Sequence, residues 1–305
     1  MKNEIILIAG GSGLVGKALK KHFENQQNEV IVLTRNEKIA NQVGYALWNP
    51  EENKINESAF LKSTVLINLA GAGIATRWTK ANKLAILSSR TNAASFLANT
   101  CSRLNKQFKH IICASAIGIY PQTNSCHKPY NENSTSGNGF LSDTVKSWEF
   151  ANTQLQPFGS FTQLRIGVVL SSNGGMLQSI VPLFNKRLGG VIGSGEQGVS
   201  WIHITDLINM IDYVASNKIN GTINAIAPNP VSQKILAKQL AIQLQKPIIL
   251  PPTPSWVLNL VLGEQAMLAT KGAYVSSEKI QSYEFDFKFE TLDLALTNLL
   301  HENIS

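Results

Sequence analysis

The chain has 305 residues, which is long for one ordinary domain and enough for one domain with a smaller lobe. Hydrophobic residues make up 44% and charged residues 15%, a globular composition that excludes a disordered chain. The net charge of +7 comes without a long run of like charges or a nucleic-acid motif. We therefore interpret it as a basic surface, with nucleic-acid binding as the weaker alternative.

The cysteines and the start of the chain indicate where the protein works. Cys101, Cys113 and Cys126 are odd in number and have no metal-binding spacing, so we predict neither disulfides nor a metal site. Cys113 lies in an apolar run and is expected in the core. The first strand follows Met1–Glu4 directly, which leaves no room for a signal peptide, and no apolar segment approaches the length of a membrane span. We expect a cytoplasmic protein.

The first motif lies at the N-terminus. The apolar run 5–9 predicts a buried strand, the following glycines predict a tight turn, and residues 14–23 predict a helix. Such a turn lets the backbone approach a pyrophosphate closely, and the helix start presents free N–H groups to it. The motif therefore predicts a dinucleotide site, with a ligand-free glycine turn as the alternative. Its residues are Gly10, Ser12, Gly13, Leu14, Val15 and Gly16.

The end of the second strand indicates which cofactor binds. Residues 29–34 form the predicted strand, which ends at Thr34 and Arg35. NAD sites usually carry a carboxylate here for the ribose 2′-hydroxyl, whereas an arginine suits a 2′-phosphate. Residues 33–36 contain no acid. We therefore predict NADP(H), with a merely solvated Arg35 as the alternative.

Strands and helices alternate along the first two thirds of the chain, which predicts an α/β fold, a Rossmann-type doubly wound parallel sheet. Ligands of such sheets bind at the carboxyl ends of the strands. There the small-residue turn with Ala70 and Gly71 offers backbone near a cofactor. Further strands are predicted at 45–48, 65–69, 108–114 and 161–170, and helices at 79–104 and 176–186.

The later chain predicts a smaller, mainly helical lobe that closes a substrate cleft. We assign residues 1–170, completed by 198–226, to the NADP-binding domain, and 171–197 with 227–305 to the substrate lobe. The apolar side chains of this lobe fit a homodimer face equally well. The glycine-rich residues 189–198 suit either a lid or a plain connection. Helices are predicted at 233–244 after the N-cap Ser232, and at 256–262, 264–270, 277–281 and 292–300.

Two local patterns complete this part of the chain. Thr205 is the predicted N-cap of a helix that ends near Tyr213, and His203 is interpreted as structural because no second histidine lies at metal spacing. The alternation of Phe285, Phe287 and Phe289 predicts a half-buried strand.

Several motifs together resemble the extended short-chain dehydrogenase/reductases, and within them an atypical subfamily named epimerase family proteins, which ends in a small domain of unassigned function. The resemblance covers nearly the whole chain and implies an NADP-binding Rossmann fold without a settled reaction. It also places Gly167 and Val168 beside the nicotinamide. The motifs are the glycine turn, 68–71, 115–120, 77–79, 89–90, 140–141, 148–149, 193–195, 200–203 and 227–228.

The chain departs from the wider superfamily in the catalytic relay. Those enzymes use a serine and a Y-x-x-x-K pair, in which the lysine lowers the pKa of the tyrosine. None of the six tyrosines here has a lysine four residues later. Alignment on Glu149 places Leu141 and Val145 at the tyrosine and lysine positions, so the standard relay is absent.

Ser115, Tyr120 and Arg90 are the candidate catalytic residues that remain. Ser115 lies at a strand end where a substrate oxygen would bind, although a capping role fits equally well. Tyr120 would donate or accept a proton if a neighbouring cation lowered its pKa, and Arg90 is the candidate cation. A pocket-wall role for Tyr120 and a surface role for Arg90 are the alternatives.

Two function classes follow. The favoured one is an NADP(H)-dependent oxidoreductase or epimerase-like enzyme with a rearranged relay and an unidentified small-molecule substrate. The other is a catalytically silent NADPH-binding sensor or regulatory protein, because the tyrosine and lysine are missing. The fold does not decide between them.

Overall fold

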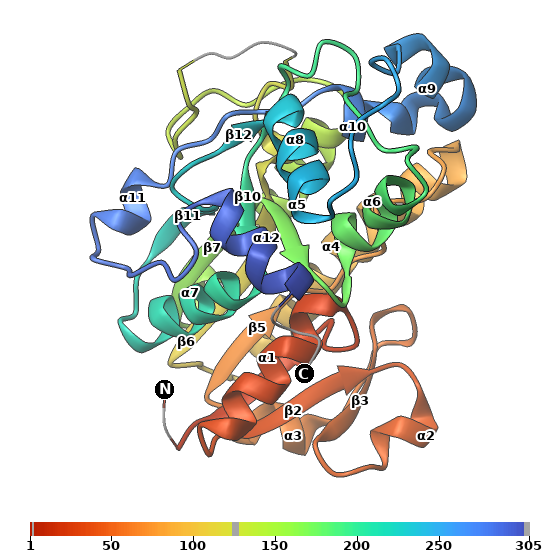
Figure 1. Ribbon diagram of the computed structural model, residues 1–305. Helices are drawn as coiled ribbons and strands as arrows, with labels where there is room; N and C mark the ends of the chain where they lie inside the picture. The colour runs from red at the N-terminus through yellow and green to blue at the C-terminus, as the bar shows by residue number, and fades with distance from the viewer. Residues whose placement is uncertain (2, 124–127, 302–305) are drawn as a thin grey trace.

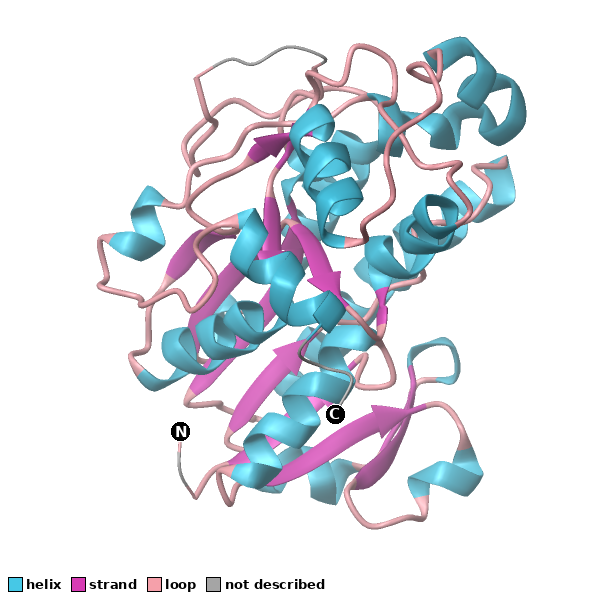
Figure 2. Cartoon of the chain, in the orientation of Figure 1, coloured by secondary structure: helices cyan, strands magenta, loops and turns pink. Residues whose placement is uncertain are grey.

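The computed structural model describes residues 1, 3–123 and 128–301. A single eight-stranded sheet runs through the lower part of the molecule (Figures 1 and 2). It is built from β1 (Ile5–Ala9), β2 (Glu29–Thr34), β3 (Tyr45–Asn49), β4 (Lys54–Ile55), β5 (Val65–Asn68), β6 (His110–Ala116), β7 (Ser160–Ile166) and β11 (Gly221–Ala225).

The strand order is β11-β7-β6-β5-β1-β2-β3-β4, and every pair is parallel except β3 with β4. The order of the strands in the sequence reverses between β1 and β5, which both pair with their neighbours in regular register. In open α/β sheets this reversal leaves a crevice beyond the carboxyl ends of the two strands, where ligands bind. The predicted Rossmann-type fold is therefore confirmed.

Helices cover both faces of the sheet (Figure 2). The run of β1 is buried on both sides, because Ile6 and Ile8 pack in one core cluster while Leu7 and Ala9 pack in another. α1 and α7 cover the first face, and α3 and α4 cover the second. The helices of this layer are α1 (Leu14–Asn25), α2 (Glu37–Ala40), α3 (Glu57–Lys62), α4 (Lys80–Arg103), α5 (Phe140–Thr153) and α7 (Ile204–Ser216).

A smaller lobe, mainly helical, stands above the carboxyl ends of the strands (Figure 1). It has its own apolar core, in which α6, α8 and α12 pack around Trp201. Its helices are α6 (Gly175–Asn185), α8 (Gln233–Gln243), α9 (Ser255–Leu262), α10 (Met267–Thr270) and α12 (Leu292–His301). The short helix α11 (Glu278–Gln281) packs instead against β11, with Ile280 in the core of the main sheet. The short strands of the lobe are β8 (Val168–Ser171), β9 (Gly198–Val199), β10 (Trp201–His203) and β12 (Val231–Ser232). The 3-10 turns of the chain are η1 (Pro50–Glu52), η2 (Ile117–Ile119), η3 (Gln156–Phe158) and η4 (Gly263–Ala266).

The single strand predicted at 161–170 is wrong, because the chain leaves the main sheet at Gly167. β7 pairs with β6 and β11, whereas β8 pairs with β10 in a separate two-stranded sheet. A Cβ on Gly167 would lie 2.4 Å from the Ser200 carbonyl oxygen. Only glycine therefore permits this crossing of the two segments, which carries the chain from the sheet into the upper lobe.

The predicted N-cap of α7 is also wrong. His203, not Thr205, caps this helix, since its Nδ1 accepts a hydrogen bond of 3.0 Å from the Thr205 amide. Burial lowers the pKa of His203 to about 4, so the ring is neutral at pH 7 and has a nitrogen free to accept. The structural interpretation of His203 is thus confirmed, through a cap that sequence rules for Ser, Thr, Asp and Asn do not include.

The phenylalanine alternation marks an extended segment that pairs with no strand. Phe285, Phe287 and Phe289 are all buried, but the residues around them form no ladder, and the amides of Lys288 and Phe289 donate to the Asp206 carboxylate instead. The burial pattern is confirmed and the predicted strand is wrong. A side chain on α7 here takes the place of a neighbouring strand.

Most other predicted elements are confirmed, with boundaries shifted by one or two residues. The strand predicted at 108–114 is β6, and the helix predicted at 264–270 divides into η4 and α10. Cys113 is fully buried, as predicted, whereas Cys126 lies outside the described residues. Within the described part of the chain, every helix is too short or too polar to cross a bilayer.

Asp212 on α7 joins this helix to α1. Its carboxylate accepts hydrogen bonds from His22 (2.9 Å), Gln26 (2.7 Å) and the N-terminal amine (2.7 Å). Burial opposes the charged form, but these donors outweigh it and hold the pKa of Asp212 below its usual range. The carboxylate therefore stabilises the folded state while it is ionised.

We expect Asp212→Asn to reduce the free energy of unfolding at pH 7 by about 1–2 kcal/mol. Because the folded-state pKa is lowered, the contribution is present above the unfolded pKa of about 3.9 and is lost as the pH falls below it. Urea unfolding at pH 7 and pH 3.5 measures this, with exposed Asp286→Asn as the control. A difference between wild type and variant that stays constant over this range would contradict the assignment.

Candidate functional site

The turn after β1 is fixed by close backbone contacts at two of its glycines. Gly10 has φ +81°, and a Cβ there would lie 2.6 Å from the Leu69 carbonyl oxygen. A Cβ on Gly16 would lie 2.4 Å from Gly11 Cα. These two positions therefore serve packing: the first against the segment that follows β5, the second between helix and turn.

Gly13 differs, because the space in front of it is open. A Cβ there would meet only the Gly10 carbonyl oxygen, at 3.4 Å. Gly13 is the N-cap of α1 and provides no side-chain cap, so the first-turn amides lack the usual protein acceptor. An open approach to uncapped amides at the positive end of a helix fits a pyrophosphate.

The remaining predicted cofactor residues lie around the same crevice. Thr34 ends β2, which pairs with β1 in register, and the exposed Arg35 follows it. Ala70 and Gly71 follow β5 on the other side, where the Leu69 amide donates to the Ala9 carbonyl at 2.9 Å. Ser12 and Val15 belong to the glycine turn and helix start. Gly167 and Val168 lie farther along the sheet edge, after β7.

The loop before α6 also reaches the glycine turn. A Cβ on Gly174 would lie 3.3 Å from Leu14 Cδ1, and one on Gly175 3.6 Å from Leu14 Cδ2. The first residue of α1 therefore contacts the start of the upper lobe. Two adjacent glycines between a strand and a helix are a sequence signal for such a close approach.

Arg90 lies beside the turn that follows β5. A Cβ on Gly71 would be 3.0 Å from the guanidinium carbon of Arg90, whose Nη1 donates to the Ile86 carbonyl at 2.8 Å. The guanidinium carbon is 5.0 Å from the ring centre of Trp148 on α5. Burial lowers the pKa of Arg90, and within the described residues no carboxylate pairs with it.

Ser115, near the end of β6, is held by a buried ion pair. Its hydroxyl donates to Glu149 Oε1 at 2.5 Å. The same carboxylate accepts two hydrogen bonds from Arg165, of 2.8 and 2.9 Å, in a bidentate pair. Although burial opposes it, this pairing raises the pKa of Arg165. Strands β6 and β7 and helix α5 are thus joined at one point.

Tyr120 is 0% exposed, and its hydroxyl lies within the same network. It donates to Asn224 Oδ1 at 2.7 Å and accepts from Arg165 Nη1 at 2.9 Å, while its ring stacks on Tyr130. Burial raises the pKa of Tyr120 and outweighs the neighbouring cation. That cation is Arg165, whereas Arg90 contacts Trp148. The catalytic role of Tyr120 stays a prediction, and its surroundings favour a structural one.

The face of α5 toward Ser115 is apolar where the relay would lie. A Cβ on Gly118, three residues after Ser115, would be 3.8 Å from both Leu141 Cβ and Val145 Cγ2. Both side chains are buried. Lys146 lies on another face, where it forms a 2.7 Å ion pair with Asp143. The structure therefore places the two apolar residues beside η2, the turn that follows Ser115.

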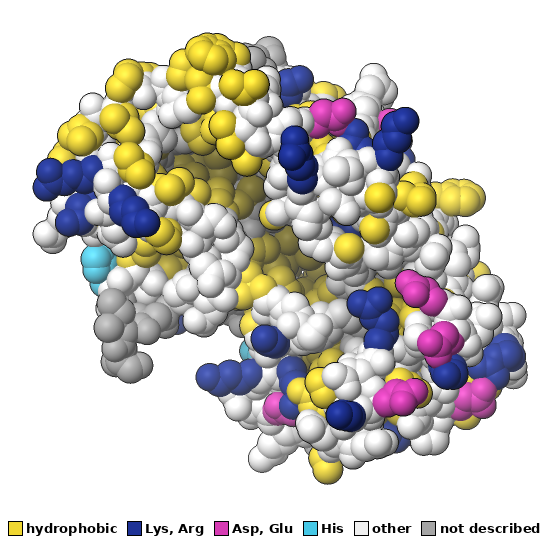
Figure 3. Space-filling view, turned by 90° about the vertical axis from the view of Figure 1, so that its right-hand side faces the viewer, with side chains coloured by type: hydrophobic (Ala, Val, Ile, Leu, Met, Phe, Trp, Pro, Cys, Tyr) yellow, Lys and Arg dark blue, Asp and Glu magenta, His cyan; other side chains and the backbone are white. Residues whose placement is uncertain are grey.

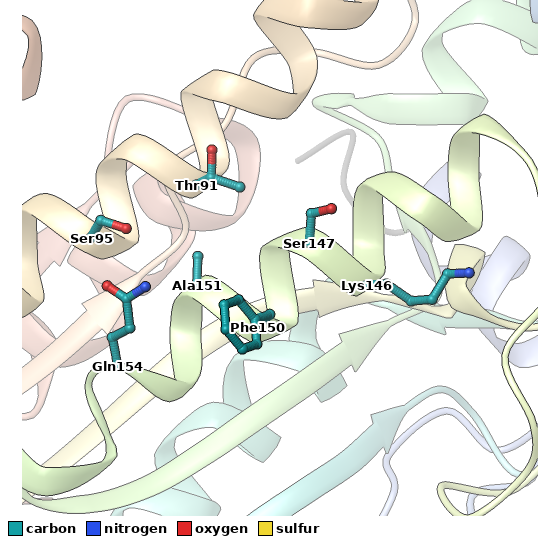
Figure 4. Close-up of a pocket in the computed structure, with 7 residues that line it drawn as sticks. All are labelled: Thr91, Ser95, Lys146, Ser147, Phe150, Ala151 and Gln154. Carbon is teal, nitrogen blue, oxygen red and sulfur yellow. The ribbon is translucent and has the colours of Figure 1, made fainter.

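A shallow groove of about 490 Å³ lies between α4 and α5. Figure 4 shows the side chains that line it. Phe150, which is 74% exposed, lies in this groove with Ser147 and Lys146 of α5 and with Thr91 of α4. The predicted cofactor residues do not line it. We therefore separate this groove from the candidate site.

A deeper hollow separates the upper and lower parts of the molecule in Figure 3, and apolar side chains line much of its visible surface. Among the contacts that join the upper lobe to α4 and α5, two come from η4 and α10. Lys83 of α4 pairs with Glu264 of η4, and Met267 packs against the cluster of Trp78, Ile86 and Leu141. Among the described residues no group of three His, Cys, Asp or Glu is placed to hold a metal ion.

The sequence did not identify the network that surrounds Ser115. Glu149 served only as an alignment marker and Arg165 only as part of a strand, and Asn224 at the end of β11 was not considered. A charged pair within otherwise apolar segments was the available signal, because buried charges need partners. Their meeting depends on the pairing of β7 with β6 and β11, which is a tertiary feature.

Comparisons with known proteins agree with this architecture. Residues 6–226 match the NAD dependent epimerase/dehydratase family, and residues 253–299 match a domain of unknown function. The chain is 36% identical over 300 residues to epimerase family protein YfhF of Bacillus subtilis, covering 97% of each chain. It is 34% identical over 303 residues to a Staphylococcus aureus epimerase family protein, covering 97% of this chain and 99% of that one.

Solved structures give the same result. Human epimerase family protein SDR39U1, solved with NADPH, superposes with a TM-score of 0.87 at 26% identity, covering 97% of this chain and 98% of that one. A nucleoside-diphosphate sugar epimerase from Corynebacterium glutamicum superposes with a TM-score of 0.79 at 29% identity, covering 99% of this chain and 59% of that chain. The family match spans the sheet, the glycine turn and Ser115. The chain therefore belongs to the NAD dependent epimerase/dehydratase family.

Proposed function

We propose that this protein is an NADP(H)-dependent oxidoreductase or epimerase-like enzyme that acts on a small molecule bound in the hollow between the sheet and the upper lobe. The observation that carries the proposal is the open space at Gly13 in front of the uncapped start of α1. The human relative solved with NADPH, which shares the fold over nearly the whole chain, supports the choice of cofactor.

The described residues fit such a cofactor. The amides of Leu14, Val15 and Gly16 would hold the pyrophosphate, and Ser12 lies in the same turn. Arg35 would pair with the 2′-phosphate, whose charge requires a cation. Ala70 and Gly71 would pass along the cofactor, and Gly167 and Val168 would lie near the nicotinamide. When bound, the nicotinamide ring supplies hydride transfer.

Arg90 and Ser115 are the residues that we assign to the substrate. Arg90 offers a positive charge that no described carboxylate neutralises, so it would attract negative charge that develops on a substrate oxygen. Ser115 offers a hydroxyl whose position Glu149 and Arg165 fix. Tyr120 would act on this site only through Arg165, because its own hydroxyl is buried.

A catalytically silent NADPH-binding protein is the second candidate. The hydrogen bonds that already occupy the Ser115 and Tyr120 hydroxyls favour it, since neither group is free in this conformation. Both candidates require the cofactor, and they differ in turnover. Consumption of NADPH with a substrate, at a rate above that of enzyme with cofactor alone, would support the enzyme.

We expect Gly13→Val to weaken NADPH binding at least about 100-fold while the fold remains intact, because its side chain would enter the open approach to α1. Calorimetric titration and thermal melting by circular dichroism measure the two effects. Gly16→Val is the matched control and should destabilise the protein, since its Cβ would overlap Gly11. Wild-type NADPH affinity in the Gly13 variant would disprove the proposed pyrophosphate site.

We expect Arg35→Ala to weaken NADPH binding about 10- to 100-fold, or about 1.4 to 2.8 kcal/mol, and to leave NADH binding unchanged. The reason is that only NADPH carries the 2′-phosphate. Calorimetric titration of both cofactors measures the selectivity. Arg103→Ala, an exposed arginine paired with Glu57, is the control. Equal losses for both cofactors, or no loss at all, would remove Arg35 from the site.

Tyr120→Phe tests whether the Tyr120 hydroxyl takes part in the reaction or stabilises the folded structure. We expect the variant to lose about 1–3 kcal/mol of stability, because Asn224 Oδ1 and Arg165 Nη1 each lose a buried partner. NADPH affinity should stay within about twofold of wild type, by calorimetry. Tyr213→Phe is the control, because the Tyr213 hydroxyl likewise donates a hydrogen bond, to the Tyr283 carbonyl, but lies near the surface. Unchanged stability in Tyr120→Phe would disprove the supporting role.

A further inference from the structure

The candidate site contains the positively charged Arg90 but no side chain that is free to donate a proton to a substrate. Arg90 reaches the turn after β5 and lies over Trp148, whose indole N–H, almost fully buried, has no acceptor among the described residues. The next residue of α5, Glu149, holds Ser115. α5 therefore contacts both Arg90, through Trp148, and Ser115, through Glu149. The partly exposed Arg90, which no described carboxylate pairs with, fits a ligand that brings an electron-rich oxygen.

Arginine can stabilise such an oxygen but cannot protonate it, because a guanidinium keeps its protons in proteins. The other described side chains that could protonate the oxygen in place of Arg90 already donate a hydrogen bond elsewhere, or are replaced by apolar residues. Ser115 donates to a carboxylate, Tyr120 donates to Asn224, and Leu141 and Val145 occupy the face where an acid and its partner would lie. Among the described residues near the carboxyl end of β6, Arg90 can therefore stabilise an anion, but no free side chain can protonate it.

We propose that the substrate is an apolar conjugated carbonyl compound, a quinone or an enone, whose hydride adduct is a delocalised oxyanion that Arg90 stabilises. This inference rests on the proposed function and adds the substrate class to it. With a quinone, dihydronicotinamide loses a hydride with its electron pair and is oxidised to the nicotinamide cation. The quinone would be reduced to the hydroquinone monoanion, and one proton from water would complete the hydroquinone. With an enone, the hydride would add to the β-carbon and give an enolate, and one proton from water at the α-carbon would complete the saturated ketone.

The chemistry of the adduct explains why this class suits the site. Hydride addition to a saturated ketone gives an alkoxide, whose conjugate acid has a pKa near that of water, about 15.7. Reduction of a quinone gives a phenolate-type anion, whose conjugate acid has a pKa of about 10, like tyrosine. The second anion is less basic by roughly six orders of magnitude. It therefore needs a positive charge more than it needs an acid.

The apolar side chains near the site favour an apolar compound. Leu141, beside Gly118, belongs to a buried cluster with Trp78 and Ile86, against which Met267 of the upper lobe packs. The neighbouring helix α9 has no buried residue, and Trp256 and Leu260 are 68% and 80% exposed. Apolar side chains continue from the upper rim into the hollow in Figure 3. An apolar ring system would cover such a surface.

The first experiment measures NADPH oxidation at 340 nm without oxygen, after calorimetry has established whether NADPH binds. Menadione represents quinones and 2-cyclohexenone represents enones, while 2-tetralone is a ketone of similar size to menadione that gives an alkoxide. We expect at least one conjugated acceptor to react about 100-fold faster than 2-tetralone. If only menadione or only 2-cyclohexenone reacts, the result shows whether the substrate is a quinone or an enone.

A binding measurement tests the anion site without turnover. In the presence of NADP⁺, 4-nitrophenolate mimics the delocalised oxyanion at pH 8.5, and its protonated form at pH 5.5 is the neutral counterpart. We expect wild type to bind the anion at least about tenfold more tightly than the phenol. Arg90→Met should abolish this preference, and Arg90→Lys should retain part of it. Circular dichroism verifies that both variants fold.

The outcomes separate the two proposals. If NADPH does not bind, the proposed function fails and the substrate class fails with it. If NADPH binds but neither conjugated acceptor reacts, or 2-tetralone reacts equally fast, the substrate class is wrong while cofactor binding stands. An unchanged preference for 4-nitrophenolate in Arg90→Met would remove Arg90 from the anion site and overturn the inference.

Discussion

The backbone contact between the turns after β1 and β5 is the constraint on which the site depends. Gly10 allows the first turn to touch the Leu69 carbonyl, and Gly16 allows α1 to start against that turn. Together they aim the amides of α1 at the crevice where the strand order reverses. Gly13, which packing does not require, leaves that crevice open. The glycine spacing therefore separates two positions used for packing from one suited to a ligand.

The Glu149–Arg165 pair provides the second fixed point, deeper along the sheet edge. A buried ion pair contributes little net stability, because desolvation offsets much of its attraction. Its bidentate geometry nevertheless fixes the positions of two hydroxyl groups. The Ser115 hydroxyl donates a hydrogen bond to Glu149, and the Tyr120 hydroxyl accepts one from Arg165. At the positions where the sequence resemblance predicts a tyrosine and a lysine, Leu141 and Val145 are apolar, and this network instead holds its hydroxyls in place. The groups left for chemistry are a cation and apolar walls.

The two lobes contribute different properties to the hollow. The sheet edge supplies the glycine turn, Ser115 and the β5 turn beside Arg90, all on rigid elements. The upper lobe supplies apolar surface, above all α9, and joins the lower part through Lys83 with Glu264 and through Met267. This division suits a protein that binds one polar and one apolar molecule side by side.

The sequence by itself determined the fold class, the glycine turn, most helices and strands and the absence of Y-x-x-x-K, because these depend on local spacing and periodicity. Two strands predicted from the sequence were wrong because residues far away in the chain determine the local structure. The first strand ends before Gly167, where the Ser200 carbonyl crosses the chain. At the second, the Asp206 carboxylate accepts the hydrogen bond of the Phe289 amide, so no neighbouring strand pairs with it. Only the tertiary structure brought Ser115, Glu149 and Arg165 together and separated Tyr120 from Arg90. Those contacts join residues from β6, α5 and β7, and no short-range pattern encodes them.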